Sequence, residues 1–130
     1  MENSMNTYNL AFVTAGGIGS IVAIVHGVLT QQFMVKPILT ETEYAKSIGR
    51  LIPLLLQFST FCWFFGGVAL MTVPFFLDTS VVLTTAAFVG TCYAYGAVGN
   101  FWSTNGRHPG WVLLAIAVAL IVYASIAATR

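Results

Sequence analysis

Four long apolar stretches decide what this chain of 130 residues can fold into. They run over residues 9–33, 51–71, 79–101 and 110–128, each close to the ~20 residues that a helix needs to cross a bilayer. Because the bilayer core offers no partner for exposed backbone N–H and C=O groups, each stretch is expected to be a helix. The sequence therefore predicts an all-α integral membrane protein with four transmembrane helices in an up-and-down bundle.

The composition agrees with lipid as the surrounding medium. Apolar residues make up 58% of the chain and charged residues only 7%, and the formal net charge is +1. So few charges cannot cover a soluble globule, in which roughly a quarter of the residues are charged. We expect one membrane domain over residues 1–130, with the lipid bilayer around it. The chain has no basic surplus for binding nucleic acid.

The first apolar stretch is expected to be retained. The leader before it, residues 1–8, contains no Lys or Arg, and no small-residue cleavage site follows the stretch. Secretory signal peptides have a basic leader and a small-residue cleavage site, and this chain shows neither. We therefore count this stretch as the first span.

Basic residues predict the orientation. Lys36, Lys46 and Arg50 lie between the first two stretches, and Arg107 lies between the last two. The opposite side has only Arg130. Since Lys and Arg are enriched in cytoplasmic loops, we expect both basic loops in the cytoplasm and both termini outside. The predicted location is the cell inner (cytoplasmic) membrane.

The first basic loop contains a helix-start signal. Thr40 followed by Glu43 matches the capping box, in which two side chains satisfy backbone N–H groups at a helix start. Tyr44, Ile48 and Leu51 follow at spacings of four and three residues. This pattern predicts a short interfacial amphipathic helix in the first cytoplasmic loop that runs into the second span.

Other punctuating residues lie near the ends of the spans. We expect Pro53 in the first turn of the second span and Pro74 at its end. Asp78 is expected to cap the third span. The Asn-Gly pair at 105–106 predicts a turn, and Pro109 the first position of the fourth span.

Stripes of small residues predict which helix faces pack together. Helices associate in lipid by close packing rather than by the hydrophobic effect, so their contacts collect small side chains. The expected packing residues are Gly16, Gly19, Ala23, Cys62, Gly66 and Gly90. On the first span the large residues Ile21, Ile24 and Val28 lie opposite and are expected to face lipid. We expect the third span to be the most buried and the fourth the most exposed to lipid.

Polar side chains form the candidate site. At 1.5 Å rise per residue, His26, Gln57 and Tyr93 are predicted near one level of the membrane, with Asn100 closer to the surface. An intramembrane ionisable residue such as His26 is by default a functional hypothesis. The alternative is that these side chains only hold the helices together, since interhelical hydrogen bonds are common in bundles. Both interpretations stay open.

Catalytic and metal chemistry have little support. The spans contain no Asp or Glu, so paired carboxylates are missing. His26 and His108 are expected at different levels, and Cys62 and Cys92 have no metal-motif spacing. We expect no catalytic residue, no metal site and no cofactor.

The first functional hypothesis is a non-enzymatic subunit, scaffold or assembly factor that acts through helix–helix contacts. Its partners would be copies of itself in a homo-oligomer or other membrane subunits. The alternative is a small oligomeric permease or channel with a polar cytoplasmic-side vestibule around His26. A weaker alternative is a redox or cofactor-binding membrane protein.

Overall fold

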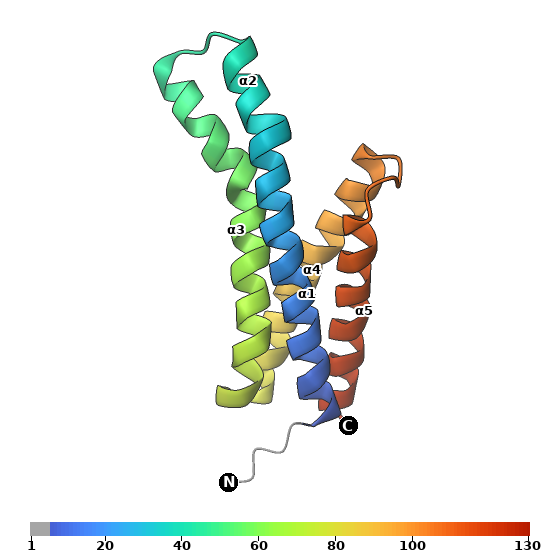
Figure 1. Cartoon of the computed structure of the whole chain (residues 1–130). Helices are drawn as coiled ribbons and strands as arrows, with labels where there is room; N and C mark the ends of the chain where they lie inside the picture. Colours follow the sequence, from blue (N-terminus) through green and yellow to red (C-terminus); the bar gives the residue numbers. More distant parts are fainter. Residues whose placement is uncertain (1–5) are drawn as a thin grey trace.

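The computed structural model describes residues 6–130, which form helices and contain no strand (Figure 1). The elements are α1 (Thr7–Thr30), a π-helical turn η1 (Gln31–Val35), α2 (Lys36–Glu41), α3 (Lys46–Phe76), α4 (Thr79–Ser103) and α5 (Gly110–Ala128). The first three join into one continuous helix of 35 residues. This long helix and α3, α4 and α5 are each long and apolar enough to cross a membrane. The fold is therefore the predicted all-α, multi-pass membrane bundle.

The helices form a ring of antiparallel neighbours. α1 packs against α3 and α5, and α4 packs against the same two helices. The α2–α3 and α4–α5 connections lie at one end of the bundle, which we call the basic end, and the α3–α4 connection lies at the other (Figure 1). Phe12, Leu70, Tyr93 and Leu114, one from each of these helices, are among the fully buried side chains. They place the core on the axis of the ring.

The first two helices are longer than the apolar stretches predicted. The first helix continues to Glu41 and α3 begins at Lys46, so a helical arm extends past the α4–α5 connection at the basic end (Figure 1). Thirty-five residues correspond to roughly 52 Å of helix, against a hydrocarbon core of about 30 Å. Hydropathy identifies the apolar part of a helix, which lies in the hydrocarbon core. More polar residues continue the same helix beyond that part.

The predicted interfacial helix is not confirmed. The residues expected to form it belong to the ends of the two long helices and to the link between them. The capping box is wrong, because Thr40 lies within the last turn of α2. Its hydroxyl donates to the carbonyl oxygens of Lys36 at 3.0 Å and Pro37 at 3.1 Å instead of accepting from a following N–H.

The two prolines of the second span also lie deeper than predicted. Pro53 is inside α3, seven residues after Lys46, and Pro74 does not end the helix, which runs on to Phe76. Asp78 is the N-cap of α4 by position, but its side chain makes no capping bond. The predicted turn is confirmed: Asn105 and Gly106 have φ of 48° and 73°, in the left-handed region.

Burial differs from the expected ranking. In its most apolar 18-residue window, the first helix buries 39% of its residues, against 33% for α4, 22% for α5 and 17% for α3. The prediction that the third span is the most buried is therefore wrong, and so is the prediction that the fourth is the most exposed. The outer face of α3 explains its low value, because Leu54, Phe58, Phe61 and Phe65 are exposed at helical spacing. Ile21, Ile24 and Val28 of α1 face outward as predicted.

Candidate functional site

His26 connects α1 to α3 near the basic end. Its Nε2 lies 3.2 Å from the hydroxyl oxygen of Ser59 on α3 and 3.3 Å from that of Thr30 one turn along α1. The imidazole also stacks on the indole of Trp63, with ring centroids 4.7 Å apart and planes inclined by 48°. These contacts hold one nitrogen and one face of the ring in the α1–α3 contact.

Gln57 makes a second connection between the same helices. Its amide nitrogen Nε2 donates to the carbonyl oxygen of Gly27 at 3.0 Å and lies 3.5 Å from Oε1 of Gln31. Gly27 has no side chain to block this approach, since a Cβ there would meet Thr60 at 2.7 Å and the Gln57 oxygen at 3.3 Å. The side chain therefore uses its amide group to bind α3 to α1.

Tyr93 lies away from this pair, deeper in the bundle. Its hydroxyl donates to the carbonyl oxygen of Trp63 at 3.1 Å, and the residue is fully buried. The hydroxyl lies against Gly19 and Gly67. Gly19 is seven residues before His26, or about 10 Å along α1. A helical side chain points back toward the start of its helix, so the tyrosine ring carries its hydroxyl away from the basic end. Tyr93 therefore makes its hydrogen bond apart from those of His26 and Gln57.

Close glycine contacts surround the Tyr93 hydroxyl. A Cβ on Gly16 would meet the carbonyl oxygen of Gly67, and a Cβ on Gly67 would meet the hydroxyl of Ser20. The Ser20 hydroxyl donates to the carbonyl oxygen of Phe64 at 3.4 Å. Sequence reasoning missed Ser20, although it lies next to Gly19 in the small-residue stripe. These contacts bring α1 and α3 together at backbone distance.

Three further predicted packing residues, Ala23, Gly66 and Gly90, are buried or lie at helix contacts. Ala23 is fully buried on α1. A Cβ on Gly66 would lie 3.1 Å from Val89 of α4, and one on Gly90 would lie 3.4 Å from Ile121 of α5.

Asn100 is separated from Gln57 and Tyr93 but shares a pocket with His26. This pocket, of about 130 Å³, lies where α1 meets the end of α4 and the start of α5. His108, which sequence reasoning placed at another level, lines it as well. The first helix continues past the α4–α5 connection, so this connection lies beside the helix and not beyond its end (Figure 1). His108 therefore reaches the same pocket as Val25 and His26.

Hydrogen bonds fix the backbone around His108. Its Nδ1 accepts from the backbone N–H of Gly110 at 3.1 Å, and its own N–H donates to the hydroxyl of Thr104 at 3.4 Å. The indole N–H of Trp111 donates to the carbonyl oxygen of Gly106 at 3.1 Å. The α4–α5 connection is therefore tied to the first turn of α5, and it holds the His108 ring in place.

The two cysteines lie on neighbouring helices and are free thiols. Cys62 of α3 and Cys92 of α4 line one groove of about 350 Å³, together with Ser59 and Thr91. Cys62 was predicted as a packing residue, and the structure places it, half-buried, at this groove. In the described part of the chain no group of three His, Cys, Asp or Glu side chains is placed to hold a metal ion.

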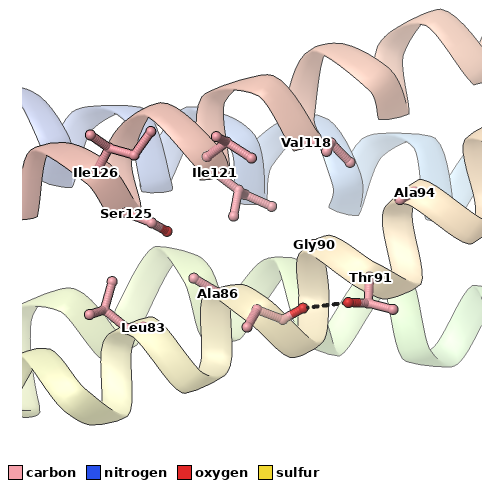
Figure 2. Close-up of a pocket in the computed structure, with 11 residues that line it drawn as sticks. Leu83, Ala86, Gly90, Thr91, Ala94, Val118, Ile121, Ser125 and Ile126 are labelled. Carbon is pink, nitrogen blue, oxygen red and sulfur yellow. Dashed lines mark hydrogen bonds between the residues drawn. The ribbon is translucent and has the colours of Figure 1, made fainter.

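A second groove, of about 490 Å³, separates α4 from α5. Figure 2 shows that small residues of α4, namely Ala86, Gly90 and Ala94, face the larger Val118 and Ile121 of α5. Two of the residues that line it, Thr91 and Ser125, have a hydroxyl group. The hydroxyl of Thr91 already donates to the carbonyl oxygen of Ala87 at 2.8 Å. The groove is a surface of α4 and α5 that these two helices do not fill between them.

Comparison with protein-family models, with curated proteins and with solved structures finds no match for this chain.

Proposed function

We propose that this chain is a membrane component without catalytic chemistry of its own, a subunit, scaffold or assembly factor that acts through helix–helix contacts. The observation that carries this proposal is the use of the interior polar side chains. Gln57 bonds to α1, Tyr93 bonds to α3, and one nitrogen of His26 contacts Ser59. These groups stabilise the bundle, and each then has less hydrogen-bonding capacity left for a substrate.

The groove between α4 and α5 supports a role in helix contacts. Small residues let helix backbones approach closely in lipid, and the half-buried Gly90 and Ala94 line a space that the chain does not fill (Figure 2). In this proposal a helix of a second copy or of another membrane subunit packs there. Large side chains on the outer face of α3 instead suit lipid tails.

The experiment is purification of the tagged full chain in a gentle detergent, with masses read by native mass spectrometry. We expect a stoichiometric partner subunit or a defined homo-oligomer. Ala94→Phe fills the groove and should abolish the complex, whereas Val98→Phe, one turn along α4 and outside the groove, should leave it intact. A monomer with nothing bound, or a complex that both variants retain, would contradict the proposal.

We also propose that the basic end faces the cytoplasm of an inner-membrane protein. Lys36, Lys46, Arg50 and Arg107 lie at that end, and Arg130 lies at the other. Single cysteines placed at Asn105 and Thr129 in a chain without Cys62 and Cys92 test this orientation. An impermeant maleimide should label position 129 in intact cells and position 105 only after lysis. The reverse pattern would invert the assignment.

A small oligomeric permease or channel is the second candidate. The shared pocket of His26, Asn100 and His108 favours it, because polar side chains gather there at the basic end. In that case His26→Ala should abolish flux in reconstituted vesicles while the protein still folds. Unchanged flux in this variant would remove His26 from the transport path.

A further inference from the structure

The pocket between α1, α4 and α5 contains hydrogen-bonding groups that the fold does not use. His108 accepts the N–H of Gly110 at Nδ1, so in the neutral ring the proton is on Nε2. Within residues 6–130, that Nε2, the Nδ1 of His26 and the side-chain amide of Asn100 have no hydrogen-bond partner. In the described residues the buried side-chain polar atoms without a partner are Oδ1 of Asn9 and Oγ1 of Thr60, so the three groups at this pocket keep accessible surface. An apolar pocket with a few convergent polar groups is the usual form of a ligand site.

The walls of the pocket are apolar. Ile21, Val22 and Val25 of α1 and Leu113 of α5 line it. No Asp or Glu lines it. A divalent cation would therefore have two imidazoles and no anionic ligand in a low-dielectric site, which is costly for a buried charge. The lining favours an uncharged ligand with an apolar body.

The size of the pocket limits that body to one ring. Its volume is about 130 Å³. An apolar cavity of roughly 150 Å³ in another protein holds a benzene molecule, so one six-membered ring matches the space.

The position of the pocket gives it access to lipid. Ile21, Val25 and Leu113 are also exposed on the outer surface of the bundle. A lipophilic ligand can enter between them from the membrane and leave a hydrocarbon tail outside.

We propose that this pocket binds the head group of a neutral lipophilic ring compound with carbonyl or hydroxyl oxygens, of the quinone or quinol class. The ring lies between the aliphatic walls, and its oxygens bond to the imidazole of His108, the imidazole of His26 and the amide of Asn100. The inference goes beyond both candidate functions and does not require either of them.

The test uses the full chain in lipid nanodiscs and a benzoquinone that carries a decyl tail. Binding is measured by quenching of the indole fluorescence, because Trp63 stacks on His26 and Trp111 follows Gly110 directly. Empty nanodiscs correct for partition of the quinone into lipid. Nitrogen NMR of the histidine rings provides a second readout. We expect saturable binding and a shift of both ring signals.

Matched variants separate the pocket from the surrounding lipid. Val25→Phe fills the pocket and leaves every polar group in place, whereas Val28→Phe makes the same change on an exposed position outside it. We expect Val25→Phe and Asn100→Leu to weaken binding about tenfold and Val28→Phe to leave it unchanged. Quenching equal to that of empty nanodiscs, or equal affinity in Val25→Phe and wild type, would overturn the proposal. So would saturable Zn²⁺ binding that shifts both ring signals while the quinone shifts neither.

Discussion

The hydroxyl of Tyr93 on α4 donates to the carbonyl oxygen of Trp63 on α3 across 3.1 Å, at a level where the tyrosine is fully buried. The bond connects two neighbouring helices of the ring beside the glycine contacts of α1. Tyr93→Phe removes the bond and keeps the ring. We expect a loss of about 0.5–1.5 kcal/mol in the free energy of unfolding, measured by SDS titration in mixed micelles. An unchanged free energy of unfolding would mean that the hydrogen bond of the Tyr93 hydroxyl does not stabilise the bundle.

Gly19 is the contact that lets the Tyr93 ring reach this place. A Cβ at Gly19 would overlap the ring and hydroxyl of Tyr93, which has no exposed surface into which to move. We expect Gly19→Ala to destabilise the bundle by about 1–3 kcal/mol, as overpacking does. Gly17 is the control on the same helix, because a Cβ there meets nothing within 4 Å.

Gly17→Ala should be neutral or stabilise the helix by up to about 1 kcal/mol, since alanine loses less backbone entropy on folding. The same SDS titration compares the two variants. Equal effects of the two substitutions would show that α1 does not pack against Tyr93 at Gly19.

The helix ends illustrate which part of the fold the sequence could predict. The last two helices begin at Thr79 and Gly110, where the apolar stretches begin, because turn residues stand directly before them. Pro109 is the N-cap of α5 and not, as predicted, its first residue. The first helix runs on to Glu41 and α3 begins at Lys46, and both residues lie outside the apolar stretches 9–33 and 51–71. Hydropathy responds to the solvent around a helix and not to its hydrogen bonds, so the extension of the first helix to Glu41 could not be predicted from it. The helix before the second span was predicted from its amphipathic spacing, and α3 does begin at Lys46.

The candidate site could be predicted only in part, because the length and direction of each side chain decide which residues it contacts. His26 and Gln57 lie at the same helix contact because each side chain needs to reach only the neighbouring helix, His26 the hydroxyl of Ser59 and Gln57 the carbonyl oxygen of Gly27. The Tyr93 ring is long, and its direction moves the hydroxyl to the level of Gly19. His108 lines the pocket because the first helix is longer than its apolar stretch and passes beside the α4–α5 connection. This relation depends on the whole topology.

The contact between His26 and Ser59 gives a prediction about the strength of the α1–α3 connection. Nε2 of His26 lies 3.2 Å from the Ser59 hydroxyl, and the half-buried pair is shielded from bulk water. A double-mutant cycle with His26→Gln and Ser59→Ala should yield a coupling of about 0.6–1.5 kcal/mol in the free energy of unfolding. Each single variant should still fold. Additive effects would mean that the two side chains do not interact in the membrane.

Cys62 and Cys92 give a direct test of the register between α3 and α4. Cys62 of α3 and Cys92 of α4 line one groove, so the two thiols face the same space between these helices. A short bifunctional thiosulfonate should therefore join them within one chain, at a yield independent of protein concentration. The linked peptides are identified by mass spectrometry after digestion, and Cys62→Ser should abolish the product. Cross-links only between two chains, or single modification of each thiol without a link, would place the cysteines on different faces and contradict the α3–α4 pairing.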